Sequence, residues 1–226
     1  MFAEIFFRLL NGFTVTLALF LITLVFAVPL GLPIALGARS RFGVVRYVVK
    51  AFVWVIRGTP LMLQVLAVSL LPNTVFKVFN KDLAAALGVS INGLNFIFVS
   101  VAFVINYACY FSEIYRAGIE SVPAGQYEAG KVLGLTKSQV FGKIVLLQVI
   151  KRIVPPMGNE IITLVKDTSL AQIIGVIDLL SAAEAAVNSL VILDPLLYAA
   201  VFYLVFNGAL TLLFGYVEKK LNFFRV

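Results

Sequence analysis

Long apolar stretches separated by short polar segments make up most of this chain. About 20 consecutive apolar residues are enough to cross a bilayer as a helix. The pattern predicts five such spans, at about 13–36, 44–71, 94–116, 156–174 and 196–216. A weakly apolar stretch at 175–194 is predicted to be a short interfacial or re-entrant helix. The sequence therefore predicts an all-α membrane protein with five transmembrane helices.

Composition supports this class. The chain is 62% hydrophobic, against about 45–50% in ordinary soluble domains. Its 226 residues supply five spans and short loops, so one transmembrane domain, 1–226, is expected, without a separate soluble catalytic domain. The first span is too long for the core of a signal peptide and is expected to be retained. A single cysteine, Cys109, and no histidine leave no disulfide and no metal site of ordinary ligand type.

Basic residues are distributed unevenly between the two sides of the predicted spans. Three lie on one side: Arg8, Lys77 and Lys81. Thirteen lie on the other: Arg39, Arg41, Arg46, Lys50, Arg116, Lys131, Lys137, Lys143, Lys151, Arg152, Lys219, Lys220 and Arg225. Because cytoplasmic loops are enriched in lysine and arginine, the amino terminus is predicted outside and the carboxyl terminus in the cytoplasm. The net charge of +7 reflects this asymmetry, so no nucleic acid partner is expected.

The fourth predicted span carries the most polar face. Glu160 and Asp167 are seven residues apart, which places them on one side of a helix about 10 Å apart along its axis, with Thr163 between them. Asn159 and Lys166 form the adjoining stripe. A charge at membrane depth costs about 2.5–3.5 kcal/mol on insertion scales, and such residues face an interior or water. This face is therefore a candidate lining of a substrate cavity.

Two other spans repeat this pattern. Asn106, Tyr110 and Glu113 share one face of the third span, and Arg57 and Gln64 share one face of the second. The three polar faces are expected to meet in a wet cavity, while the apolar first and fifth spans suit the lipid side. The alternative is that the charges form structural ion pairs, Glu113 with Arg116 and Lys166 with Asp167.

The second span is also interrupted. In Arg57-Gly58-Thr59-Pro60, Pro60 removes a backbone donor and disfavours helix at Thr59. Broken helices at membrane depth line protein or water, and in transporters they often border the substrate. A kink needed only for packing is the alternative.

A charged loop, about 118–155, separates the third and fourth spans. It has helical periodicity and is suited to being held by a soluble partner, so it is predicted to be a coupling element. The residues expected to take part are Gln126, Tyr127, Glu128, Ala129, Gly130, Leu133 and Gly134. Small residues there allow close approach of another surface, and Gly134 is also expected to end a helix.

With these residues in place, the chain resembles the polar amino acid permeases of bacterial ATP-binding-cassette (ABC) importers over nearly its whole length. The family signature is Glu-Ala-Ala, three residues, Gly, nine residues and Ile-x-Leu-Pro. This chain has Glu128-Ala129-Gly130, Gly134 and Ile144-Val145-Leu146-Leu147, with Gly130 and Leu147 as departures. Three further stretches match the amino acid subfamily: Arg57-Gly58-Thr59-Pro60-Leu61, Gly125-Gln126-Tyr127-Glu128-Ala129 and Lys166-Asp167-Thr168-Ser169-Leu170.

The resemblance implies a type I ABC importer permease fold in the bacterial inner membrane. It also implies partners: a second permease copy or a close paralogue, two ATPase subunits that bind ATP-Mg, and an extracytoplasmic amino acid-binding protein. The chain itself is expected to be no enzyme and to need no cofactor, since it has no Gly-x-x-x-x-Gly-Lys-Ser/Thr phosphate-binding loop.

The predicted substrate follows from the carboxylates. Glu160 and Asp167, with Glu113 opposite, favour a basic amino acid, namely arginine, lysine or histidine. Its carboxylate could meet Arg57 or backbone donors at the broken helix. Glutamine or another neutral polar amino acid is the alternative substrate. A stand-alone ion-coupled carrier and a membrane scaffold for the ATPase are alternatives of another class, although no internal repeat of the carrier type is found.

Overall fold

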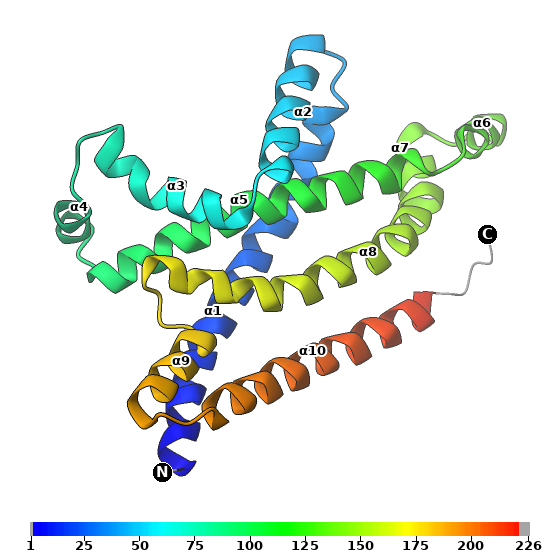
Figure 1. The fold of residues 1–226 in the computed structure, drawn as a ribbon. Coiled ribbons are helices and arrows are strands. Elements are labelled where there is room, and N and C mark those ends of the chain that lie inside the picture. The colour runs from blue at the N-terminus through cyan, green and yellow to red at the C-terminus, as the bar shows by residue number, and fades with distance from the viewer. Residues whose placement is uncertain (1, 222–226) are drawn as a thin grey trace.

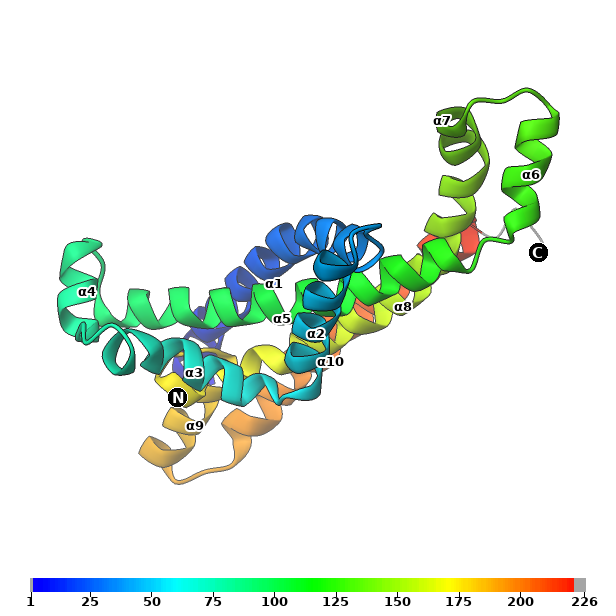
Figure 2. The same ribbon diagram turned by 90° about the horizontal axis from the view of Figure 1, so that it is seen from above.

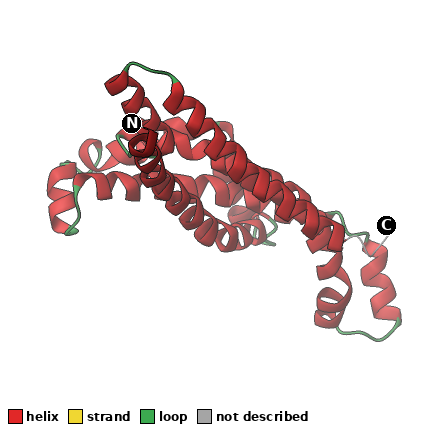
Figure 3. Ribbon diagram, turned by 90° about the horizontal axis from the view of Figure 1, so that it is seen from below, coloured by secondary structure: helices red, strands yellow, loops and turns green. Residues whose placement is uncertain are grey.

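The computed structural model describes residues 2–221, and all regular elements in that part of the chain are helices (Figures 1 and 3). Arg225, counted above with the basic residues, lies outside it. The longer helices are α1 (Phe2–Ala38), α2 (Gly43–Gly58), α3 (Leu61–Thr74), α5 (Ile91–Glu120), α8 (Leu146–Asp167), α9 (Leu179–Leu190) and α10 (Asp194–Leu221). The shorter ones are α4 (Asn80–Ala86), α6 (Ala124–Val132), α7 (Lys137–Val140), a π-helical turn η1 (Phe141–Val145) and a 3-10 segment η2 (Thr168–Ile174).

The centre of the fold is the parallel pair α1 and α5 (Figure 1). Gly31 of α1 lies against Phe111 and Tyr115 of α5, and the Tyr115 hydroxyl donates a hydrogen bond of 3.0 Å to the Val28 carbonyl. The expectation that the first span faces mainly lipid is therefore wrong for one of its faces, because the buried side of α1 forms part of the main core. By contrast, only 6% of the apolar stretch of α10 is buried within the chain, as expected for a lipid-facing helix.

Five spans were predicted, and the described helices supply between three and five, depending on whether each bent pair counts as one span. Three described helices, α1, α5 and α10, are long and apolar enough to cross a membrane alone, and the number is up to five if each bent pair is one span. The α2–α3 pair bends by 108° at the predicted interruption. The pair formed by the helix ending at Ile174 and α9 bends by 57°. The stretch predicted as interfacial or re-entrant is thus largely α9, which packs on α1 and α10.

Two boundaries differ from the predictions. Helix α1 begins at Phe2, well before residue 13. Helix α8 begins at Leu146 and continues through Pro155 and Pro156, although residue 156 was the predicted start. A proline inside a helix normally loses one backbone hydrogen bond and bends the helix. Both prolines lie on an exposed side of α8, where their rings meet little of the remaining chain.

The helix ends sort into two groups (Figures 1 and 2). The start of α1 lies beside the start of α10, where the Phe2 and Tyr198 rings are 5.5 Å apart. At the opposite end of α1, Arg39 approaches Glu120 at the end of α5, with 3.6 Å between nitrogen and oxygen. The α6–α7 hairpin extends from this second end. Most of the basic residues predicted to be cytoplasmic belong to the same end, whereas Lys77 and Lys81 lie near α4.

Candidate functional site

A polar cavity of about 480 Å³ lies where the broken second span meets α5 and the end of α8. This volume is within the roughly 300–1,000 Å³ typical of small-molecule sites. Of the predicted site residues, Arg57, Asn106, Tyr110, Glu160, Thr163 and Asp167 line it, together with Gly58, Thr59, Pro60, Leu61, Tyr107 and Leu170. Three sequence segments that are far apart in the chain therefore meet as predicted.

The interruption between α2 and α3 forms one wall of this cavity. Thr59 and Pro60 are extended, so the carbonyls at the end of α2 lose their helical partners. The Gln64 side-chain amide takes their place, donating to the Ile56 carbonyl at 2.7 Å and to the Thr59 carbonyl at 3.1 Å. It also lies 2.9 Å from the Thr59 hydroxyl. Gln64 of α3 thus bridges the break by hydrogen bonds to the last turn of α2 and to Thr59.

Gln64 also connects the break to α5. Its carbonyl oxygen accepts a hydrogen bond of 3.0 Å from the buried Asn106 amide. Gln64 was predicted as a cavity residue, but it does not line the cavity. Because its amide group is occupied by backbone and by Asn106, its observed contacts fix the shape of the wall. Asn159 likewise does not line the cavity. It is exposed, and its backbone carbonyl accepts a hydrogen bond from the Thr163 hydroxyl.

Asp167 is held from across the cavity by a residue that the sequence patterns missed. The Tyr107 hydroxyl of α5 donates to the Asp167 carboxylate at 2.7 Å. Within residues 2–221 Lys166 and Asp167 do not form the alternative ion pair; Lys166 is exposed and lines a different pocket. A buried tyrosine hydroxyl needs a partner, and that requirement was the signal that could have identified Tyr107.

Arg57 is held by two groups of α5. Its guanidinium lies 4.9 Å from the centre of the Tyr110 ring, within cation–π range, and 3.7 Å from the Glu113 carboxylate. Glu113 in turn accepts a hydrogen bond of 2.7 Å from Arg116. Glu113 was predicted to line the substrate cavity opposite Glu160. It does not line the cavity of about 480 Å³, but it lines an adjoining pocket together with Glu160 and belongs to an ion-pair cluster. The alternative pairing with Arg116 is thus present, with Arg57 as a second cation.

Glu160 differs from the other acidic residues of the site. Within the described chain its carboxylate forms no hydrogen bond or ion pair, although it is partly buried and lines the cavity beside Thr163. An unpaired carboxylate in a poorly hydrated site is costly until a cation or donor reaches it. Glu160 is therefore available to a ligand.

The cavity continues toward the loop end of the molecule. A second pocket of about 490 Å³ shares Arg57, Tyr110 and Glu160 with the first. Its other charged lining residues are Glu113, Arg116 and Arg152, and Arg152 donates to the carbonyl and hydroxyl of Ser121 at the end of α5. A charged path thus leads from the cavity to the base of the α6–α7 hairpin.

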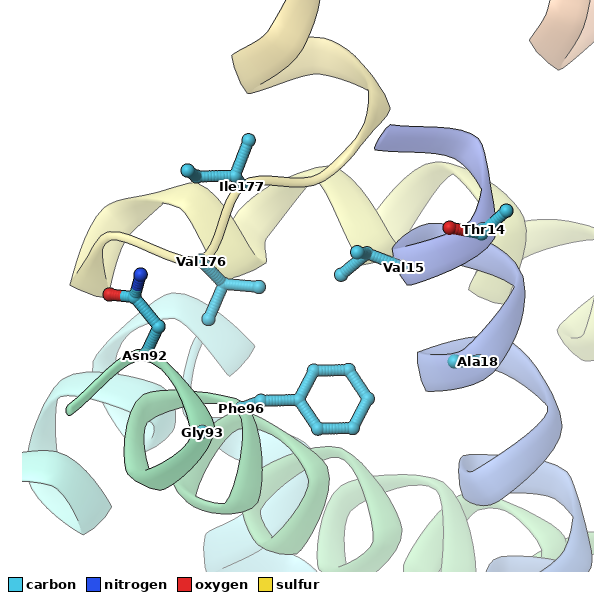
Figure 4. Close-up of a pocket in the computed structure, with 8 residues that line it drawn as sticks. All are labelled: Thr14, Val15, Ala18, Asn92, Gly93, Phe96, Val176 and Ile177. Atoms are coloured by element: carbon cyan, nitrogen blue, oxygen red, sulfur yellow. The ribbon is translucent and has the colours of Figure 1, made fainter. Parts of the chain in front are cut away.

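A larger pocket, of about 630 Å³, lies elsewhere, between α1, the start of α5 and the segment before α9 (Figure 4). Its side chains are mainly apolar, among them Val15, Phe96 and Ile177, and none of its lining residues is charged. Its lining therefore offers the ammonium and carboxylate groups of an amino acid only the neutral polar side chains of Thr14 and Asn92, without an opposite charge. The smaller charged cavity is the better candidate for the substrate site.

The predicted coupling segment folds as the α6–α7 hairpin. Gly134 has φ of +70° just after α6, and the Leu135 amide donates to the Gly130 carbonyl at 2.9 Å, so Gly134 ends the helix as predicted. Gly130 is buried against Val140 of α7, where a β-carbon would overlap that side chain. The small residue at position 130 therefore allows the close approach of Val140 from the same chain.

Apolar side chains project from the end of α6. Val132 is 88% exposed and Leu133 is 73% exposed, and Tyr127, Glu128 and Ala129 are also exposed. Gln126 is half-buried. Large apolar groups side by side at a water-exposed tip are typical of a surface that another protein covers.

These features define a class: a helical membrane subunit with broken spans, a charged internal cavity and a protruding hairpin, which is a transporter architecture. Residues 27–223 match the family described as the inner membrane component of binding-protein-dependent transport systems, and the chain belongs to it. It is thus a permease subunit of an amino acid ABC importer of the inner membrane, with the type I importer permease fold. Subunits of this family are not themselves enzymes and act in complexes with an ATPase and a substrate-binding protein.

The relatives have different substrates. The chain is 34% identical over 214 residues to an L-cystine transport system permease protein of Bacillus subtilis, covering 94% of this chain and 86% of that one. It is 32% identical over 216 residues to an arginine transport system permease protein of the same organism, covering 95% and 92%. A solved amino acid ABC transporter with histidines aligns at a TM-score of 0.81 and 29% identity, covering 97% and 96%.

Proposed function

We propose that this subunit imports a basic amino acid through the cavity between the broken second span, α5 and α8. The observation that carries the proposal is the charge of the lining, one cation, Arg57, and two carboxylates, Glu160 and Asp167. A basic amino acid presents the complementary set of one carboxylate and two cations. Charge-assisted hydrogen bonds of this kind contribute about 1.5–3 kcal/mol each.

The roles follow from the contacts. Arg57, held at the break, meets the substrate carboxylate. Glu160, which has no partner of its own, meets the cationic side chain, and Asp167 meets the α-ammonium group. Thr163 and Asn106 add polar contacts at the wall. The relatives named for arginine and for histidines support a basic substrate.

A neutral polar amino acid is the second candidate, and one observation favours it. The Tyr107 hydroxyl already occupies Asp167 at 2.7 Å. If that hydrogen bond persists during transport, Arg57 and Glu160 alone remain for the substrate, which matches the single carboxylate and ammonium of glutamine. The relatives named for L-cystine and glutamine are consistent with this alternative.

The complex is proposed to contain a second copy of this chain or a close paralogue, two ATPase subunits and an extracytoplasmic binding protein. ATP and Mg²⁺ are bound by the ATPase, which docks on the tip of α6 through Val132 and Leu133. The α6–α7 end is then cytoplasmic and the amino terminus lies outside, in accord with the basic residues at that end. One transmembrane domain, 1–226, carries both functions, with the coupling loop between α5 and α8.

Uptake by proteoliposomes that contain this chain with its ATPase and binding protein tests the proposal. Arginine and glutamine are offered side by side at equal concentration. ATP-dependent uptake of arginine with weak uptake of glutamine is expected. Preferential uptake of glutamine would assign the second candidate, and ATP-dependent uptake of neither would contradict both.

A further inference from the structure

The acidic residue Glu113 lines the adjoining pocket of about 490 Å³ and not the cavity of about 480 Å³, yet it contacts Arg57, which lines both. Its carboxylate is 3.7 Å from the Arg57 guanidinium and is itself fixed by Arg116 at 2.7 Å. Arg116 also pairs with Glu120 at 2.6 Å, and Glu120 lies 3.6 Å from Arg39 at the end of α1. Arg57 is thus the last member of a chain of alternating charges.

This series of ion pairs matters because few other contacts fix the position of the Arg57 side chain. It lies in the last turn of α2, next to Gly58, whose Cβ position has nothing within 4 Å. Its side chain is 40% exposed, against 23% for Glu113 and 28% for Arg116. A long side chain beside a helix break loses considerable rotamer freedom when it is held in one place. The Tyr110 ring and Glu113 are the two contacts that hold it.

We propose that Glu113 is a positioning residue, which holds the Arg57 guanidinium at the cavity wall so that it can receive the carboxylate of the substrate. The inference rests on the proposed function and assigns Glu113 a role through Arg57 instead of a contact with the amino acid. Every amino acid carries the α-carboxylate. Loss of Glu113 therefore affects basic and neutral substrates alike, unlike loss of Glu160.

A double-mutant cycle in the reconstituted complex tests this role. The variants are Glu113→Gln, Arg57→Met and the two combined, and the measurements are KM and maximal rate for arginine and for glutamine. We expect Glu113→Gln to raise KM about tenfold for each transported substrate, with the maximal rate within about twofold of wild type. In the Arg57→Met background, Glu113→Gln should change KM no further.

Glu4→Gln is the matched control. Glu4 and Arg8 form an ion pair of 2.7 Å between exposed side chains of α1, far from the cavity. Removing this ion pair should leave KM unchanged, because ion pairs between exposed side chains contribute little to stability.

Three results would overturn the inference. A wild-type KM in Glu113→Gln excludes a positioning role. Single effects that multiply in the double variant indicate that Glu113 contacts the substrate itself. A loss for arginine only gives Glu113 a charge-selective role. If Glu113→Gln does not accumulate, the same cycle is run with Glu113→Asp, which keeps a charge beside Arg116, and the same criteria apply. Absence of ATP-dependent amino acid uptake in the wild type contradicts the proposed function instead.

Discussion

The cavity and the tip of α6 depart from the usual distribution of polar and apolar groups in opposite directions. The cavity places Arg57, Glu160 and Asp167 within the membrane-spanning part of the fold. The tip places Val132 and Leu133 in water, 88% and 73% exposed. Each arrangement is unfavourable in the isolated chain, because charges favour water and apolar groups avoid it. In the proposed function each becomes favourable when a partner arrives, a charged substrate in one case and a protein surface in the other.

The regions also differ in what holds them. The cavity wall is fixed by hydrogen bonds between distant segments, such as Gln64 with Asn106 and Tyr107 with Asp167. The hairpin is fixed locally, by the Thr136–Gln139 capping box and the contact of Gly130 with Val140. A change in one region should therefore leave the fold of the other intact. The following predictions use that independence.

The largest effect is expected from charging the tip. Replacing Val132 and Leu133 together by aspartate should reduce ATP-driven uptake by about a hundredfold or more, since burying each side chain contributes roughly 1.5–3 kcal/mol. The test is co-purification with the ATPase subunit, together with uptake. Val132→Ile with Leu133→Met keeps the surface apolar and serves as control. Normal ATPase binding by the aspartate variant would place the docking surface elsewhere.

The second effect concerns the unpaired carboxylate of the cavity. Glu160→Gln keeps the shape and removes the charge, so uptake of arginine should fall ten- to a hundredfold, at about 1.4 kcal/mol per factor of ten. Glutamine uptake and ATPase binding should remain near wild type. Uptake of both amino acids in the same vesicles decides the matter, and equal losses for both would indicate a structural role for Glu160.

A smaller effect is expected from changing Gln64, which bridges the break between α2 and α3 by hydrogen bonds. Gln64→Leu removes the hydrogen bonds to the Ile56 and Thr59 carbonyls and to Asn106. A lost hydrogen bond typically costs about 0.5–1.5 kcal/mol. Because the wall is displaced for every substrate, KM should rise up to about tenfold for arginine and glutamine alike. An effect confined to one of them would make Gln64 a substrate ligand.

The smallest effect is expected within the hairpin. Gly130→Ala introduces a β-carbon that overlaps Val140, and overpacking of this kind costs about 1–3 kcal/mol. ATPase affinity should fall severalfold, while arginine binding in the cavity is unchanged. Adding Val140→Ala makes room and should restore the affinity, which is measured by titrating the purified complex with ATPase subunit. Failure of this rescue would mean that the partner itself approaches Gly130.

The features that were predictable from the sequence depend on local patterns. The apolar runs predicted the apolar helices, and Pro60 predicted the interruption of the second span. The spacing of Glu160, Thr163 and Asp167 predicted that they share one face of α8. In each case neighbours in the chain determine the outcome. The ending of α6 at Gly134 is of the same kind, because only the local backbone decides it.

The remaining features depend on pairs that are distant in the chain. Tyr107 and Asp167 are 60 residues apart, and no periodicity within one helix indicates their hydrogen bond. Glu113 was placed on the correct face of α5, but its position along the helix relative to Arg57 depends on how α2 packs, and it lines the adjoining pocket instead of the cavity of about 480 Å³. The start of α8 was misplaced because the proline rule applies to helices in general, whereas exposed prolines on this helix are accommodated.

The parallel packing of α1 and α5 has a consequence for the order of membrane insertion. Two parallel neighbours in a bilayer need an intervening segment that crosses in the opposite direction, and here that segment is the broken pair α2–α3. Helix α2 carries Arg57, which is costly at membrane depth until it is paired. Its partners Tyr110 and Glu113, and the Asn106 that engages Gln64, all belong to α5. During synthesis the span that carries Arg57 therefore enters the membrane before α5, the helix that supplies its partners.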